Sequence, residues 1–161
     1  MQDTTGWGDE TAMEMAAAPE RVWSLLADVT RMGEWSPVCG RCEWTDGAVG
    51  PEVGARFVGH SRQGIVRFSR VCEVTASDPG RDFAFRTFFQ GAESTRWRYQ
   101  FEPTPTGTRV TESYEVVVMP RWVRFLHHFP GMHAKARRDA RRNMTSTLAC
   151  LRSAAERRTD T

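Results

Sequence analysis

The sequence predicts an α+β fold in which a curved antiparallel sheet of about seven strands wraps around one long C-terminal helix. Between Val38 and Val118, apolar and polar residues alternate and turn residues recur at short intervals, which is typical of consecutive antiparallel strands. Between Met132 and Ala155 the apolar period changes to that of a helix. One sheet with one long helix to cover it forms two layers, so we expect a cavity between them.

Two short helices are expected directly after a first strand over residues 10–17. The first helix begins at Pro19, because a helix tolerates proline in its first turn, where the missing N–H would have no partner. Glu20 suits the positive end of the helix dipole. Asp28 is expected to cap the second helix, which extends through Met32.

The remaining six strands are predicted from period-two patterns and from the turn residues between them. The alternation is cleanest around Trp97, Tyr99 and Phe101, which share one face while Arg96 and Arg98 share the other. Such a strand is buried on one face and solvated on the other. The predicted strands cover residues 38–45, 55–61, 65–77, 83–89, 95–101 and 109–118.

The C-terminal part is predicted to be helical in two pieces. In residues 121–129, Trp122, Phe125 and Phe129 fall on one face, so this short segment is expected to lie over the cavity as a lid. The long helix over residues 132–155 would measure roughly 30–35 Å, enough to cross the sheet. Arg141 lies near its apolar stripe and could reach the cavity, where a carboxylate or an anionic ligand would have to neutralise it.

Length and composition predict one soluble domain. The chain has 161 residues, 40% hydrophobic and 26% charged, as in ordinary globular proteins. We expect tails over residues 1–9 and 156–161 and a single ligand-binding domain over residues 10–155. No apolar run approaches the ~20 residues needed to cross a bilayer. The acidic start lacks the basic region of a signal peptide, so a cytoplasmic location with reduced cysteines is expected.

The basic residues do not predict a nucleic-acid interface. The net charge is only +2, and the 22 basic residues, all arginine except Lys135, are spread along the chain. The denser patch from Lys135 to Arg142 is interpreted as a solvated helix face.

No metal site or cofactor is predicted. Cys39 and Cys42 have the spacing of half a zinc site, but no second pair accompanies them. Residues i and i+3 of a regular strand also point to opposite faces, which argues against shared coordination. His127 and His128 are neighbours on a predicted helix and project about 100° apart, so they are poor joint ligands.

The sequence contains no motif for a catalytic triad, phosphate loop or dinucleotide fold. The candidate catalytic residues are isolated polar groups on strands, each of which could instead be structural or solvated: Glu112, Tyr99, Arg86 and His60. Alternation alone does not decide whether Glu112 or Ser113 points inward. The candidate ligand-binding residues, chosen for their predicted position at the cavity, are Phe57, Phe85, Trp97, Tyr99, Tyr114, Trp122, Phe125, Arg141 and Met144.

Several segments resemble a known family. They are the run from Met15 to Asp28 with its Ala-Pro-Glu helix opening, Trp35-Ser36-Pro37, Gly54 to Phe57, Trp97 to Pro103, and Gly107 to Glu112. Together they are similar to the polyketide cyclase/dehydrase and lipid-transport family of the START-like (SRPBCC) superfamily, over about residues 10–155. The resemblance implies the helix-grip fold. It implies less about function, since the family includes ligand carriers, cyclases, dehydratases and proteins of no known activity.

Three functions therefore stay open at the level of sequence. The first is binding of a small apolar or aromatic ligand, polyketide-like or lipid-like, in a cavity between the sheet and the C-terminal helix. The second is a polyketide cyclase or dehydratase, in which catalysis rests largely on folding the substrate and leaves little motif. The third is a membrane-peripheral or partner-binding module that uses the 121–129 segment and the Arg141 patch. No nucleic acid and no integral membrane association are expected, and the protein is either a monomer or a homodimer.

Overall fold

The computed structural model describes residues 7–119, 121–126 and 128–157. Its seven strands form one antiparallel sheet in the order β1-β7-β6-β5-β4-β3-β2. The strands are β1 (Trp7–Met15), β2 (Cys39–Thr45), β3 (Arg56–Gln63), β4 (Val66–Asp78), β5 (Asp82–Phe89), β6 (Ala92–Thr104) and β7 (Gly107–Val116). The helices are α1 (Pro19–Ala27), the 3-10 helix η1 (Val29–Glu34), α2 (Arg121–Leu126) and α3 (Met132–Glu156).

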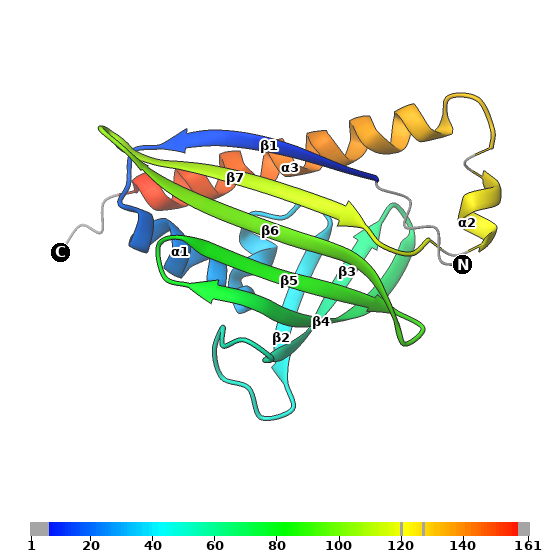
Figure 1. Cartoon of the computed structure of the whole chain (residues 1–161), viewed down its shortest axis with the longest axis horizontal. Helices are drawn as coiled ribbons and strands as arrows, with labels where there is room; N and C mark the ends of the chain where they lie inside the picture. Colours follow the sequence, from blue (N-terminus) through cyan, green and yellow to red (C-terminus); the bar gives the residue numbers. More distant parts are fainter. Residues whose placement is uncertain (1–6, 120, 127, 158–161) are drawn as a thin grey trace.

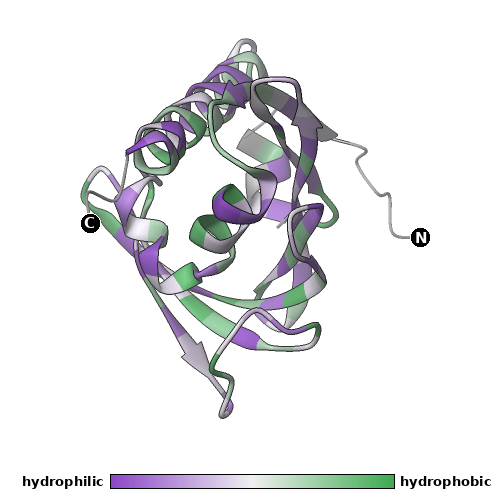
Figure 2. Cartoon of the chain, turned by 90° about the vertical axis from the view of Figure 1, so that its left-hand side faces the viewer, coloured by the Kyte–Doolittle hydropathy of each residue, from purple (hydrophilic) through white to green (hydrophobic). Residues whose placement is uncertain are grey.

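The predicted α+β helix-grip fold is confirmed. Strands β2 to β7 pair in chain order, and β1 pairs with the last of them. Helix α3 extends along the sheet on the side of β1 and β7 (Figure 1). Seen from the end where α1 lies, the sheet curves around the helical elements (Figure 2).

Strand β1 begins earlier than the sequence predicted. Residues 7–9 were expected to belong to the N-terminal tail, but they pair with Val116, Glu115 and Tyr114 of β7. The Asp9 carboxylate also accepts two hydrogen bonds from the Arg141 guanidinium of α3, at 2.6 and 2.9 Å. The prediction was wrong here because Gly8 and Asp9 interrupt the alternation of apolar and polar residues in the sequence. At the other end, Glu156 was expected to begin the C-terminal tail, but it is the last residue of α3 and accepts a hydrogen bond of 2.9 Å from the Ala16 N–H. Residues 1–6 and 158–161 of the predicted tails lie outside the described residues.

The core lies between the sheet and the helices and is unevenly distributed along α3. Leu26 of α1, Phe83 of β5, and Leu148 and Leu151 of α3 are fully buried. The buried residues of α3 begin only at Met144. Within the described part of α3, residues 132–143 therefore project beyond the core. Among all described residues, no helix is both long enough and apolar enough to cross a bilayer.

The 3-10 helix η1 packs closely against the edge strand β2, and this contact requires a glycine. A Cβ atom at Gly33 would overlap the carbonyl oxygen of Gly40, which lies in β2. Because the overlap would be with a backbone atom, no rotation of a side chain could relieve it.

We predict that Gly33→Ala lowers the free energy of unfolding by about 1–3 kcal/mol, the usual cost of overpacking. Gly50→Ala is the matched control, since a Cβ atom there meets nothing within 4 Å. Chemical denaturation of both variants measures the difference, and equal stabilities would contradict the close backbone contact.

Candidate functional site

A tyrosine and a glutamate meet on the inner face of the sheet. Tyr99 of β6 and Glu112 of β7 are cross-strand partners in the register of the two strands. The Tyr99 hydroxyl donates a hydrogen bond of 2.8 Å to Glu112 Oε1. Only 3% of Tyr99 and 2% of Glu112 is exposed. The question left open by the sequence is thereby answered: Glu112, and not Ser113, points inward.

Burial decides the protonation state of this carboxyl group. Removal from water penalises the charged form and raises the Glu112 pKa from 4.5 to about 8, although the bond from Tyr99 lowers it in part. Burial and the nearby Glu112 likewise raise the pKa of Tyr99, which keeps the phenol protonated. At neutral pH, Glu112 is therefore mostly a neutral carboxylic acid.

The second carboxyl oxygen gives the site its chemical character. Oε2 of Glu112 is buried and has no hydrogen-bond partner among the residues that the structure describes. Because Oε1 accepts the hydrogen bond from Tyr99, the acid proton belongs on Oε2. A buried polar group normally has a partner, and leaving it without one costs about 1–3 kcal/mol. The inner face thus holds a buried hydrogen-bond donor that has no acceptor among the described residues.

Apolar and aromatic side chains share the inner face with this pair. Phe57 and Phe85 are buried and make an edge contact, with ring centroids 5.3 Å apart. Trp97 and Tyr114 are partly buried, and their ring centroids also lie 5.3 Å apart. Met144 of α3 is 1% exposed. Six of the predicted ligand-binding residues, these five and Tyr99, therefore lie in the interior or at its margin.

The other predicted site residues lie elsewhere. Arg86 is on the outer face, where it donates a hydrogen bond of 2.7 Å to Glu73. Trp122 and Phe125 of α2 are 64% and 68% exposed, so the segment predicted to be a lid does not bury these side chains against the interior. Arg141 does not reach the Tyr99 and Glu112 pair, because the Asp9 carboxylate of β1 binds its guanidinium.

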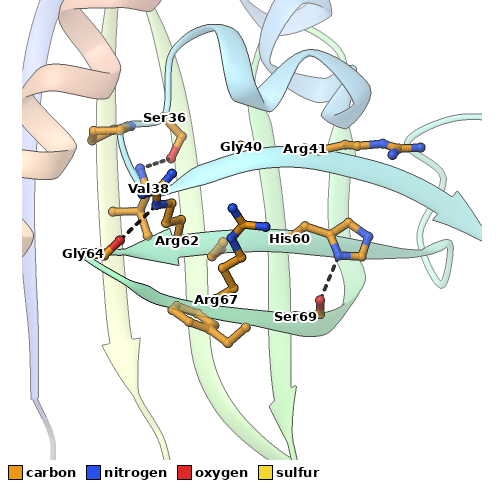
Figure 3. A pocket seen from close by; sticks show the side chains of 12 residues that line it. Ser36, Val38, Gly40, Arg41, His60, Arg62, Gly64, Arg67 and Ser69 are labelled. Atoms are coloured by element: carbon orange, nitrogen blue, oxygen red, sulfur yellow. Dashed lines mark hydrogen bonds between the residues drawn. The ribbon is translucent and has the colours of Figure 1, made fainter.

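His60, the fourth catalytic candidate, lines a separate groove at the β2 edge of the sheet. The groove has a volume of about 870 Å³. Figure 3 shows the His60 and Arg62 side chains projecting from β3 and those of Arg67 and Ser69 from β4. His60 Nδ1 and Ser69 Oγ share a hydrogen bond of 2.8 Å. This groove is open and is lined by both polar and apolar side chains, and it lies apart from the inner face that holds Glu112.

The sequence analysis missed a pair of neighbouring thiols. The register of β2 against β3 shifts between Cys39 and Arg41, so Gly40 is an extra residue in the strand. Cys39 and Cys42 therefore share one face, with their sulfur atoms 3.2 Å apart. The expectation that they point to opposite faces was wrong because it assumed a regular strand. Within the described residues, no group of three or more His, Cys, Asp or Glu side chains is placed to hold a metal ion.

Comparison with known proteins identifies the family. The family described as polyketide cyclase/dehydrase and lipid transport matches residues 10–156. The chain belongs to this family. No curated protein matches the sequence.

Solved structures of similar proteins share the fold of this family member. A polyketide-cyclase-like protein of Corynebacterium glutamicum is 32% identical over 91% of this chain and 90% of its own, with a TM-score of 0.57. A protein of Mesorhizobium loti is 18% identical over 96% of this chain and 100% of its own, with a TM-score of 0.68. The di-domain ARO/CYC StfQ from the steffimycin biosynthetic pathway is 15% identical over 92% of this chain and 50% of its own, with a TM-score of 0.74. At 18% and 15% identity, the last two show similarity of fold alone.

We predict that the buried Glu112 makes the protein less stable as the pH rises. The carboxyl group binds its proton more tightly when folded, with a pKa of about 8, than when unfolded, with a pKa of about 4.5. Its contribution is therefore fully present below pH 4.5 and is lost as the pH rises to about 8. One pKa unit corresponds to about 1.4 kcal/mol, so the loss has an upper limit of about 5 kcal/mol.

Denaturation between pH 4 and 8.5 tests this by comparing the wild type with Glu112→Gln, which does not ionise. The stability of the wild type relative to this variant should fall over that range. Glu102→Gln is the control, because Glu102 is exposed on the same sheet. Parallel pH curves for the wild type and Glu112→Gln would contradict the raised pKa.

Removing the Tyr99 hydroxyl should raise the pKa of Glu112 further, because the hydrogen bond from Tyr99 is what lowers it. We expect Tyr99→Phe to show this shift in a carboxyl ¹³C NMR titration and to lose about 1–3 kcal/mol of stability. Tyr114→Phe changes the other tyrosine of the chain. If the two variants gave the same Glu112 titration curve, the hydrogen bond would have no role in setting this pKa.

Proposed function

We propose that the protein binds a small apolar or aromatic ligand of polyketide or lipid type between the sheet and α3. In this proposal, the neutral Glu112 carboxyl donates a hydrogen bond from Oε2 to a carbonyl or phenolic oxygen of the ligand. The observation that carries the proposal is the buried Oε2 atom, which lacks a partner among the described residues. A ligand oxygen would supply the missing acceptor.

The surroundings of Glu112 support a ligand that is mostly apolar. Ligand sites in proteins usually combine apolar walls with a few polar groups that fix orientation. Here the walls would come from the buried Phe85 and Met144 and from the partly buried Trp97 and Tyr114. Tyr99 would orient the carboxyl by holding Oε1. A charged ligand would find no compensating charge in the Tyr99 and Glu112 pair at neutral pH.

A second candidate function is catalysis of polyketide cyclisation or dehydration. It is favoured by the pKa of Glu112, about 8, since a general acid or base works best when its pKa lies near the operating pH. The carboxyl would polarise a substrate carbonyl by donating its proton toward the oxygen. Most of the rate enhancement would come from folding the substrate into a reactive shape.

Native mass spectrometry of the gently purified protein is the first test. A stoichiometric small adduct that is lost on denaturation would identify the class of ligand. The adduct is expected to be apolar and to carry at least one oxygen. A polyanionic adduct would contradict the proposal.

Two substitutions of Glu112 separate the two candidate functions. Binding can be followed by displacement of an anilinonaphthalene dye with anthraquinone, which carries carbonyl oxygens, and with anthracene, which has none. Glu112→Met removes the donor and should weaken anthraquinone binding about tenfold, the effect of one hydrogen bond of ~1.4 kcal/mol, while anthracene binding stays unchanged.

Glu112→Gln keeps an N–H donor but has no acid proton, so it should bind anthraquinone within a few-fold of the wild type. On an identified substrate, this variant would retain binding and lose turnover if the protein is an enzyme. Equal weakening of anthraquinone and anthracene by Glu112→Met would overturn the hydrogen-bond role, and thermal denaturation of each variant controls for loss of fold.

A further inference from the structure

The bulge in strand β2 creates a close pair of thiols that the proposed ligand site does not use. Gly40 is the extra residue, and it brings Cys39 and Cys42 to the same face with their sulfur atoms 3.2 Å apart. A disulfide bond requires about 2.05 Å, so the two sulfurs need to approach by only about 1 Å. Such an approach is within the reach of small side-chain rotations.

Gly59, on the neighbouring strand β3, lies directly against the thiol pair. It is the cross-strand partner of Cys42. A Cβ atom at this position would lie 3.5 Å from both the Cys39 and the Cys42 sulfur, which is ordinary van der Waals contact. Both sulfur atoms therefore face the same position of β3.

The two thiols differ in accessibility and acidity, as an attacking and a resolving cysteine must. Cys39 is partly exposed, whereas Cys42 is 4% exposed. The hydrogen bond with Cys42 lowers the pKa of Cys39 to about 7. The same contact and burial raise the pKa of Cys42. Burial also raises the pKa of Cys72 of β4, to about 12, so this third inward thiol is unreactive by comparison.

We propose that Cys39 and Cys42 form a reversible redox site whose oxidant is a low-molecular-weight disulfide. The Cys39 thiolate attacks one sulfur of the small disulfide, forms a mixed disulfide and releases one thiol. Cys42 then loses its proton and attacks the Cys39 sulfur, which closes the Cys39–Cys42 disulfide and releases the second thiol. The two cysteines are oxidised by two electrons, and the small disulfide is reduced to two thiols.

The redox site lies near the inner-face pair but does not depend on its function. Negative charge on Cys39 or Cys42 would raise the pKa of Tyr99, which shows that the thiols and the phenol are close enough to interact. The proposal stands on the geometry of the two thiols, so it can hold or fail whatever ligand Glu112 binds.

The test uses the full-length protein carrying Cys150→Ser, because Cys150 is exposed and would form adducts of its own. The reduced protein is equilibrated with oxidised and reduced glutathione, alkylated and weighed by intact mass spectrometry. After alkylation under denaturing conditions, we expect a product whose mass equals that of the reduced chain minus two hydrogens, for the disulfide, plus one alkyl group, on Cys72. Peptide mapping should place the bond between Cys39 and Cys42, and added dithiothreitol should reverse it.

Single substitutions test the order of the two steps. In Cys42→Ala the resolving thiol is absent, so Cys39 should accumulate a stable glutathione adduct. In Cys39→Ala the buried Cys42 should stay free of glutathione. Loss of the hydrogen bond in Cys42→Ala should also slow alkylation of Cys39 at pH 7 by about fivefold or more. Cys72→Ala is the matched control and should form the Cys39–Cys42 disulfide normally.

Two results would overturn the proposal. One is a protein in which Cys39 and Cys42 both stay reduced at every glutathione ratio while thermal denaturation shows that it is folded. The other is a stable glutathione adduct on Cys39 in the presence of Cys42, because the two sulfurs then fail to reach bonding distance.

Discussion

The pairing of β6 with β7 determines which polar groups enter the interior of this protein. Because successive residues of a strand point to opposite faces, a shift of one residue would place Ser113 inside and Glu112 in solvent. The observed register sets Glu112 opposite Tyr99, whose hydroxyl reaches one carboxyl oxygen. Desolvation then keeps the carboxyl neutral. The strand register thus sets both the Tyr99–Glu112 hydrogen bond and the burial that keeps Glu112 neutral. The chemistry of the interior depends on these three linked features.

The family relationship accounts for the fold but leaves the chemistry to individual side chains. A chain that is 32% identical and another that is 15% identical share the same architecture with this protein. One architecture can serve many functions, so the distinguishing information lies in the residues that face the interior. Under the proposed function, the neutral acid among aromatic side chains selects an oxygen-bearing apolar ligand over a charged one. The groove beside His60, lined by residues of β2, β3 and β4, is a separate site with several arginine side chains.

The spacing of apolar residues and the turn residues predicted nearly all of the helices and strands. Each departure from the prediction has a specific physical cause. Strand β1 extends back to Trp7, and its Asp9 forms an ion pair with Arg141, a partner 132 residues away that no local pattern reveals. The thiol pair depends on the bulge at Gly40, which changes the face of a residue without changing the apolar pattern. Glu112 was one of four catalytic candidates, and only the three-dimensional structure separates it from Arg86 and His60, which lie outside.

Helix α3 combines two segments of unequal local stability. Its C-terminal half is anchored by Leu148 and Leu151, which are fully buried. Its N-terminal half has contacts with β1 through the Asp9–Arg141 ion pair and the ring contact of Trp7 with His133, and it begins next to the exposed Phe129. In contrast to the C-terminal half, the buried residues of α3 begin only at Met144, so its first turns have few apolar contacts. We therefore expect the first turns of α3 to exchange their amide hydrogens ahead of the rest of the helix.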